Sequence, residues 1–301
     1  MKNEPIYVEL SIDSEMDKLW NATQNPDLHQ QWDLRFSEIK YLPKEEGKPQ
    51  EFLYRTNIGF GKSIEGWGKS VGSHHTEDGS KTSSLHFGTD QAISIIKEGR
   101  GYWKYIPQSD HSIQFLTQYN YEPSFGLPGK LFDRFIFRPM MGWATALSFD
   151  VLKRWMETGE TPASQYTRFF SNVLLSFFFS FLWIYHGIVP KLIAMHPDEV
   201  LMVTNILPLT NNEGELIVLV AGVLEVLVGI TWMLYKNKRR LFCFQAIAFP
   251  ILMATAIVSD IHYIFLPFNP LTFNLALLVL SIIGIRISAN IPTATSCKRK
   301  P

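Results

Sequence analysis

The run LIVLVAGVLEVLVGITWMLY, residues 216–235, decides the fold of this chain. An almost wholly apolar segment of about 20 residues is the length that crosses the hydrocarbon core of a bilayer as a helix. Three more apolar segments of similar length lie at residues 169–189, 241–263 and 268–287. The sequence therefore predicts an all-α bundle of about four transmembrane helices in the C-terminal half.

Basic residues lie near alternate ends of these segments. Cytoplasmic loops of membrane proteins carry an excess of Lys and Arg. The residues on one side are Lys153, Arg154, Arg168, Lys236, Lys238, Arg239, Arg240, Lys298, Arg299 and Lys300. The opposite loops hold one basic residue, Lys191. We therefore expect a multi-pass protein of the plasma membrane, with both termini and the soluble half in the cytoplasm.

Several polar side chains interrupt the apolar segments, and antiparallel threading places them in the outer half of the bundle. They are His186, Lys191, Glu225, Asp260, His262 and Asn274. Because hydrocarbon does not solvate such groups, they should face inward and satisfy one another or line a polar cavity. Three interpretations stay open: contacts between helices, a proton relay or quinone-like pocket, and a path for a small solute. Their spacing matches no metal-ligand motif, so we expect no metal.

Charge and cysteine content exclude some classes of protein. The chain balances 28 Lys and Arg against 28 Asp and Glu, and no basic stripe marks its first half, so nucleic acid is not an expected partner. Two cysteines, Cys243 and Cys297, are too few for a disulfide scaffold or a thiolate zinc site. The opening MKNEPIYVELSID lacks the apolar stretch of a signal peptide, so we expect the first domain not to be exported.

The N-terminal half reads as an α+β domain. Residues 5–12 alternate apolar and polar like a half-buried strand, and two short helices broken at Asn25-Pro26 follow. Six strand-like runs lie between residues 35 and 124, and a long helix is predicted over 128–157. The apolar stripe of that helix comprises Phe132, Ile136, Met140, Trp143, Leu147, Val151 and Trp155, with a kink expected at Pro139. This element order predicts a helix-grip fold, in which an antiparallel sheet wraps around the final helix and leaves a cavity.

Aromatic side chains are the candidates for lining that cavity. They are Trp32, Phe52, Trp67, Phe87, Trp103, Tyr105 and Tyr119. Strand alternation puts Trp103 and Tyr105 on one face and Tyr102 on the other. The alternative is that these rings only fill the core. No nucleophile with a nearby base, paired carboxylates or phosphate-binding glycine loop stands out, so the sequence does not demand an enzyme.

Both halves resemble known families. The run VELSIDSEMDKLWNATQNPDLHQQWDLRFSEIKYL at 8–42 and GRGYWKYIP at 99–107 resemble START-like, polyketide cyclase-type domains of the SRPBCC superfamily. The second half is similar to the DoxX-like membrane family, through WIYHGIVPKL at 183–192, HPDE at 196–199, Gly222, Glu225 and Gly229, and FNPLTFNLAL at 268–277. The resemblance implies a helix-grip domain over 1–158, a linker at 159–167, a four-helix membrane domain over 168–290 and a basic tail at 291–301.

The resemblance also implies the functions to be weighed. The leading hypothesis is a cytoplasmic domain that binds a hydrophobic small molecule, a lipid or a quinone, and is coupled to the membrane bundle. The alternatives are a quinone-interacting accessory subunit of an oxidoreductase, and a structural or assembly protein without catalysis. None of the three requires a cofactor.

Overall fold

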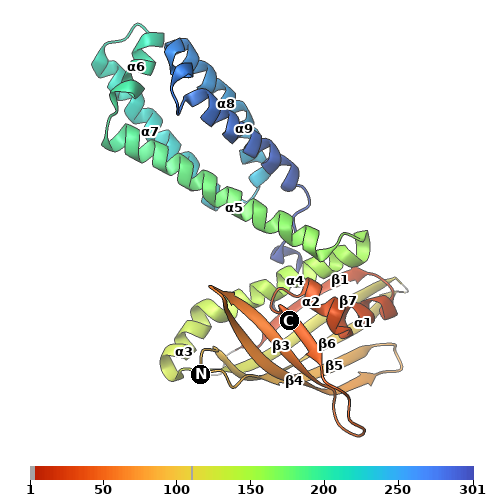
Figure 1. Cartoon of the computed structure of the whole chain (residues 1–301). Coiled ribbons are helices and arrows are strands. Elements are labelled where there is room, and N and C mark those ends of the chain that lie inside the picture. Colours follow the sequence, from red (N-terminus) through yellow and green to blue (C-terminus); the bar gives the residue numbers. More distant parts are fainter. Residues whose placement is uncertain (1–3, 110) are drawn as a thin grey trace. The chain divides into compact units, whose positions relative to one another are not determined.

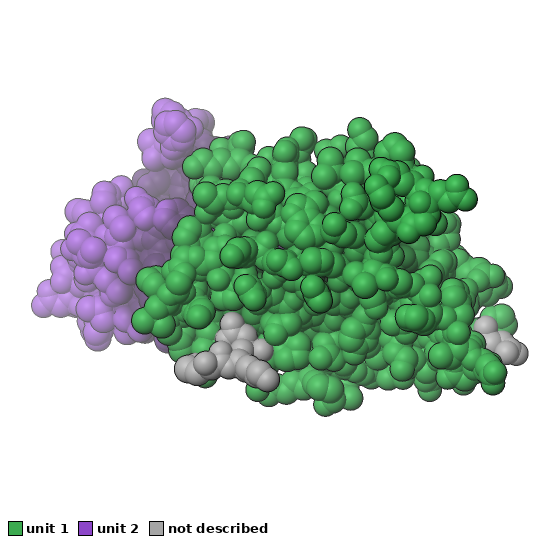
Figure 2. All heavy atoms as spheres, turned by 90° about the horizontal axis from the view of Figure 1, so that it is seen from below, with its two compact units in different colours: residues 1–166, 292–301 green, residues 167–291 purple. Residues whose placement is uncertain are grey.

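The computed structural model describes residues 4–109 and 111–301 and divides into two compact units (Figure 1). The first, unit 1, comprises Met1–Tyr166 together with Pro292–Pro301, and the second, unit 2, comprises Thr167–Ile291 (Figure 2). Each unit has its own core.

Unit 1 is built on a seven-stranded sheet in which all neighbouring strands are antiparallel. The strands are β1 (Ile6–Asp13), β2 (Glu38–Tyr41), β3 (Glu51–Gly59), β4 (Lys62–His75), β5 (Lys81–Gly88), β6 (Ile96–Ser109) and β7 (Ser112–Pro123). Their order across the sheet is β1-β7-β6-β5-β4-β3-β2, so the first and last strands of the chain segment are neighbours. The expected antiparallel sheet of an α+β domain is confirmed.

The helices of unit 1 are α1 (Met16–Gln24), α2 (Pro26–Trp32), α3 (Gly126–Phe132), the π-helix η1 (Asp133–Phe137) and α4 (Arg138–Thr158). The expected break between α1 and α2 is confirmed, because the Asn25 side chain accepts a hydrogen bond from the Asp27 N–H at 3.0 Å and Pro26 opens α2. The single long helix predicted over 128–157 is instead three segments, with the π-helical turn just before Pro139. Figure 1 shows α4 lying along one face of the sheet.

The apolar stripe of this helical stretch changes its role along its length. Leu147 and Val151 are fully buried against the sheet, as expected. Phe132, Ile136 and Met140 are exposed, although the same periodicity includes them. Helical period identifies one face of a helix but not how far along that face another element covers it.

Glycines leave room for aromatic rings on the face of the sheet that α4 covers. One row across the strands alternates large and small, with Phe52, Gly68, Phe87, Gly99 and Tyr121 as successive partners. A Cβ on Gly68 would lie 2.2 Å from the Phe52 ring, and one on Gly99 would lie 2.5 Å from the Phe87 ring. Only glycine admits these rings.

The chain end belongs to unit 1. The tail expected at 291–301 pairs with β1, since Glu9 and Lys298 exchange two backbone hydrogen bonds of 2.9 Å. Cys297 is buried, donates to the Ala146 carbonyl at 3.3 Å, and has its thiol pKa raised to about 12 by burial. The tail thus covers part of an edge strand, which would otherwise present unpaired backbone groups.

The linker expected at 159–167 is largely helical. Gly159 ends α4 with a φ of +76°, and the next helix, α5 (Pro162–His186), begins three residues later. Gln165 is buried and donates to the Val151 and Glu160 carbonyls. The border between the units falls after Tyr166, inside α5 and within the range expected for the linker.

Unit 2 continues α5 with the π-helix η2 (Gly187–Ile193) and adds α6 (Pro197–Ile206), α7 (Asn211–Leu234), α8 (Lys238–Ser259), the 3-10 helix η3 (Ile261–Phe265) and α9 (Pro270–Ile287). In the described part of the chain, four helical stretches are long and apolar enough to cross a membrane: Pro162–Ile193, α7, α8 and α9. This agrees with the expected four-helix bundle; α6 was not expected. Aromatic side chains form its core, with Phe179 and Trp232 stacked at 5.5 Å and Phe242 edge-on to Trp232 at 4.7 Å.

The replacement Gly101→Ala should destabilise the sheet by about 1–3 kcal/mol, because the new methyl would lie 2.4 Å from Tyr119 Cβ and 3.0 Å from the Gln118 carbonyl oxygen. Gly72→Ala is the matched control, since its nearest neighbour would be 3.7 Å away. Hydrogen–deuterium exchange of β6 and β7 peptides in the full-length protein measures the effect. Equal protection in the two variants would contradict the expected clash.

Candidate functional site

The sheet face beneath α4 carries the candidate site of unit 1. Its half-buried rings are Phe52, Tyr54 and Phe87, and the buried Tyr119 lies 6.5 Å from Phe87, ring centre to ring centre. Tyr119 Oη is 2.9 Å from Thr145 Oγ1, which ties the sheet to α4. Residual exposure of these rings leaves apolar surface for a ligand to cover.

Trp67 lies on the opposite face from the other candidates. It pairs with Leu53 and Gly88, one position out of step with Phe52 and Phe87, and successive strand residues point to opposite faces. Its ring packs edge-on against His86 at 5.1 Å. A small hollow of about 140 Å³ between β3 and β4 is nevertheless lined by both Phe52 and Trp67.

Trp32, Trp103 and Tyr105 fill the interior at the other end of this face. All three are buried, and Trp32 Nε1 donates to the Ala22 carbonyl at 2.9 Å. Tyr105 Oη lies 2.7 Å from Thr23 Oγ1, and burial raises the pKa of this phenol despite that hydrogen bond. These three rings fill a core, as the alternative interpretation expected. Only the half-buried rings keep exposed surface that a ligand could contact.

A buried charged cluster that the sequence reasoning missed lies beside these rings. Arg35 donates two hydrogen bonds to Asp33, from Nε to Oδ1 at 2.8 Å and from Nη2 to Oδ2 at 2.6 Å. His29 Nε2 lies 3.0 Å from Asp33 Oδ2. Burial would raise the pKa of the Asp33 carboxyl, but the Arg35 charge and hydrogen bonds outweigh burial and hold it well below its usual range. Asp33 is therefore ionised at neutral pH. The sequence feature that could have indicated this cluster is the run Trp32–Arg35, in which Asp33 and Arg35 closely follow a tryptophan.

Arg35 also connects the charged cluster to the aromatic surface. Its guanidinium carbon lies 5.3 Å from the Tyr119 ring centre and 5.6 Å from that of Phe36, both within cation–π range. Phe36 in turn packs edge-on against Tyr54 at 5.5 Å. The arrangement places one cation, held by a carboxylate, at the border of a half-buried aromatic surface.

A second buried cluster fixes the start of α4. Tyr121 Oη donates to Asp133 Oδ1 at 2.5 Å, and Arg138 Nε donates to Asp133 Oδ2 at 2.9 Å. Arg138 also lies over the Tyr121 ring at 4.3 Å. These bonds hold the π-helical turn against β7, and the sequence analysis did not identify them.

In unit 2 the expected polar cluster is only partly gathered. Lys191 Nζ lies 3.1 Å from Glu225 Oε2 and 3.2 Å from Glu199 Oε1, and the lysine and Glu225 side chains are 10% and 15% exposed. The Glu225 contact is an ion pair without hydrogen-bond geometry, so this oxygen has no hydrogen-bond partner among the described residues. Glu199, on α6, is a partner that the sequence reasoning placed only in a loop.

Local backbone geometry brings Lys191 to Glu225. The π-helical winding of η2 contains Pro190, which offers no N–H to the helix. Gly187 and Gly222 let η2 and α7 approach closely, since a Cβ on Gly222 would lie 2.9 Å from the Gly187 carbonyl oxygen and 2.9 Å from Lys191 Cβ. The DoxX-like glycines thus determine where the ion pair forms.

The other members of the expected cluster make local contacts. His186 packs against the Phe273 ring at 5.5 Å, and Asn274 donates to the Pro270 carbonyl of its own helix at 2.8 Å. Asp260 accepts from the His262 N–H and contacts His262 Nδ1, both at 2.8 Å, at the exposed start of η3. Within the part of the chain that the structure describes, no three His, Cys, Asp or Glu side chains are grouped to hold a metal.

Three other polar groups are buried in the aromatic core of unit 2. They are the indole N–H groups of Trp183 and Trp232 and both amide atoms of Gln245, none of which has a hydrogen-bond partner among the residues described. Gln245 is fully buried on α8, between Phe242 and Phe249. The sequence analysis did not single these residues out.

The replacement Lys191→Met should destabilise unit 2 by about 3–5 kcal/mol, because it leaves Glu225 buried without its cation. The double replacement Lys191→Met with Glu225→Leu should recover most of that loss. Thermal loss of helical circular dichroism from the full-length protein in detergent measures both. Lys236→Met, at an exposed lysine between α7 and α8, is the control. A double variant as unstable as the single one would refute the pairing.

Comparison with known proteins gives matches to both units. A family model described as DoxX-like matches residues 180–282. The membrane protein YndG of Bacillus subtilis (strain 168), described as uncharacterised, is 46% identical over 187 residues, which cover 62% of this chain and 70% of YndG.

Solved structures similar to this chain cover its N-terminal half. The Zhui aromatase/cyclase from a Streptomyces species has a TM-score of 0.38 at 8% identity, and the match covers 52% of this chain and 96% of that one. A START superfamily protein from Mycobacterium smegmatis has a TM-score of 0.34 at 10% identity, over 46% and 91% of the two chains. A Staphylococcus aureus protein of unknown function has a TM-score of 0.38 at 16% identity, over 52% and 97%.

Unit 1 has the antiparallel sheet and the long final helix that were expected of it, and the DoxX-like match lies in unit 2, among the membrane-length helices. The identity to YndG extends over most of that protein. The chain belongs to the family of the membrane protein YndG, and its residues 180–282 match the DoxX-like family model.

Proposed function

We propose that the protein binds a hydrophobic small molecule with an acidic or hydrogen-bond-accepting group, a lipid or a quinone, on the sheet face beneath α4. The observation that carries the proposal is Arg35, held by Asp33 at the border of the half-buried rings. Apolar surface with a few fixed polar groups is the usual composition of a small-molecule site. The protein then acts by binding, and the DoxX-like unit keeps the site beside the membrane that supplies the ligand.

The half-buried rings support the apolar part of this site. The outer ends of the Phe52 and Phe87 rings occupy the space above Gly68 and Gly99, where a Cβ would lie 2.2 and 2.5 Å from them. A ring supported by backbone loses little freedom when a ligand covers it, which favours binding.

Arg35 supports the polar part. Two of its nitrogens are used by Asp33, which fixes the guanidinium plane before a ligand arrives. A planar guanidinium can donate to a carboxylate or carbonyl in a defined direction. The geometry favours a ligand with an oxygen at one end and an apolar body that extends over Phe87.

Membrane orientation is the second part of the proposal. Basic residues gather at the ends of α5, α7, α8 and α9 that the positive-inside pattern assigns to the cytoplasm. In this orientation unit 1 is cytoplasmic and the membrane is the plasma membrane. An accessible-cysteine assay on intact cells tests it.

Photo-cross-linking of the full-length protein with a diazirine fatty acid tests ligand binding. We expect labelled peptides from β3 to β7 and α4, and loss of labelling in Phe87→Ala because the apolar surface is reduced. Tyr102→Ala is the matched control, a half-buried ring on the opposite face that should keep wild-type labelling.

Labelling of unit 1 that is equal in Phe87→Ala and Tyr102→Ala would count against the site. Labelling confined to unit 2 would refute the proposal. The third hypothesis, a structural or assembly role, would then gain support from a stable partner in cross-linked membranes.

Quinone binding inside the bundle is the second candidate function. The residues expected to bind the quinone already have other contacts: His186 packs against the Phe273 ring, and Glu225 forms an ion pair with Lys191. What favours it is that Trp183, Trp232 and Gln245 have side-chain N–H groups without a hydrogen-bond partner among the described residues, and these could donate to carbonyl oxygens in an aromatic setting. Buried polar groups without partners are rare and call for a partner or a function.

Gln245→Leu separates a quinone site from simple packing. If the amide only fills space, the apolar replacement removes an unpaired polar group and should raise the unfolding temperature without changing quinone binding. If a quinone binds, its affinity should fall. Ubiquinone titration by tryptophan quenching in detergent measures the difference, with Gln108→Leu, at an exposed position in unit 1, as the control.

A further inference from the structure

An exposed apolar surface runs along the helical stretch from α3 to the start of α4. Its residues, called the apolar band here, are Leu127, Leu131, Phe132, Phe135, Ile136 and Met140. Leu127 and Phe135 are 71% and 70% exposed, and Leu131 and Ile136 are 50% and 56% exposed. They fall in two rows at steps of four, 127-131-135 and 132-136-140, so they are neighbours on the helix. A contiguous apolar surface of this kind on a soluble unit marks an interaction site.

Basic side chains flank the apolar band. Lys130, Arg134 and Arg138 form a third row at steps of four, called the basic row here. Arg138 is paired with the buried Asp133, and Lys130 and Arg134 are the exposed members of the row. The combination of an apolar face with a basic edge is the composition of helices that lie in the surface of an anionic membrane.

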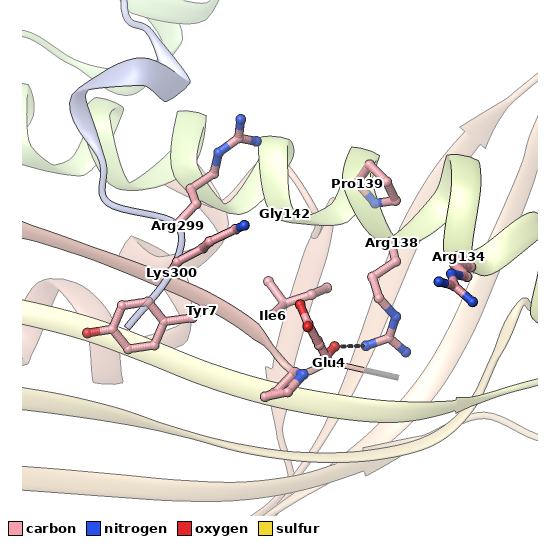
Figure 3. Close-up of a pocket in the computed structure, with 10 residues that line it drawn as sticks. Glu4, Ile6, Tyr7, Arg134, Arg138, Pro139, Gly142, Arg299 and Lys300 are labelled. Atoms are coloured by element: carbon pink, nitrogen blue, oxygen red, sulfur yellow. Dashed lines mark hydrogen bonds between the residues drawn. The ribbon is translucent and has the colours of Figure 1, made fainter. Parts of the chain in front are cut away.

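A basic hollow of about 860 Å³ adjoins the basic row (Figure 3). Arg134 and Arg138 line it from the helix, and Arg299 and Lys300 line it from the chain end. Arg138 Nη1 donates to the Glu4 carbonyl at 2.9 Å, which fixes the wall of the hollow next to β1. Glu4 also lines the hollow and Arg138 is paired with Asp133, so Arg134, Arg299 and Lys300 give the hollow its excess of positive charge, which favours an anionic headgroup.

We propose that the apolar band inserts into the surface of an anionic lipid leaflet, with the basic row and hollow against the phosphate headgroups. The bilayer is chosen over a protein partner because the band is bordered by a row of cations, and because the same chain carries four membrane-length helices. This tether keeps a bilayer at high local concentration, so weak docking suffices. The proposal concerns a different surface from the sheet face beneath α4 and does not depend on ligand binding there.

A fluorescent probe on the apolar band tests the proposal in the full-length protein. NBD is attached at Leu131→Cys in a Cys243→Ser background, while Cys297 stays unlabelled because it is buried. The protein is placed in nanodiscs of phosphatidylcholine with phosphatidylglycerol, or of phosphatidylcholine alone, each with doxyl-labelled lipid. We expect strong quenching in the anionic discs, weaker quenching in neutral discs, and a decrease at 1 M salt, where the Debye length falls to about 3 Å.

Two controls make the result specific. NBD at Val71→Cys, an exposed apolar position on β4, should not be quenched. Lys130→Glu with Arg134→Glu should abolish quenching at position 131, whereas Lys40→Glu with Lys62→Glu, at exposed lysines on the sheet, should leave it unchanged.

Quenching at position 131 no stronger than at position 71 would overturn the proposal. A blue-shifted NBD emission that lipid quenchers do not reach would also overturn the proposal if it grew with the number of protein copies per disc. That result would mean that a second copy covers the band. Quenching that ignores both lipid charge and the charge reversal would overturn the assignment to anionic lipid.

Discussion

Close approach at glycine is the constraint on which both units depend. In unit 1, Gly68 and Gly99 leave room for the Phe52 and Phe87 rings, and Gly101 leaves room for Tyr119 Cβ, and this produces the aromatic surface next to Arg35. In unit 2, Gly187 and Gly222 allow η2 and α7 to touch, and this brings Lys191 to Glu225. A methyl group at any of these positions would overlap a neighbouring atom. Glycines, which have no side chain, therefore help to position the side chains of the candidate sites.

The buried charged side chains named above are paired with an opposite charge in both units. Asp33 has Arg35, Asp133 has Arg138, and Glu225 has Lys191. Removing charges from water costs several kcal/mol per ion, and only well-placed partners offset this cost. Such pairs specify geometry more than they add stability. Arg35 and Arg138 also lie over aromatic rings, and Arg35 is the one whose ring neighbour Tyr119 packs against the half-buried Phe87.

The helical stretch over residues 126–158 connects the folding of unit 1 with its surroundings. Its second half buries Leu147 and Val151 and closes the domain, whereas its first half leaves large apolar side chains uncovered. The π-helical turn, held by Asp133, Tyr121 and Arg138, lies within the first half. One amphipathic pattern thus provides a core contact at one end and an interaction surface at the other, and the difference depends only on where the sheet ends.

The sequence by itself determined the four membrane-length helices, the α+β character of the first half and its break at Asn25-Pro26, because apolar length, strand alternation and capping are local properties. It did not find Asp33 with Arg35, or Glu199 beside Lys191, because these pairs depend on which elements meet in space. Trp67 could not be placed on the outer face without the strand register. The tail and the start of α5 belong to unit 1 for the same reason. The tail pairs with the edge strand β1, and Gln165 at the start of α5 is buried against α4. Both contacts exist only once the tertiary structure has formed.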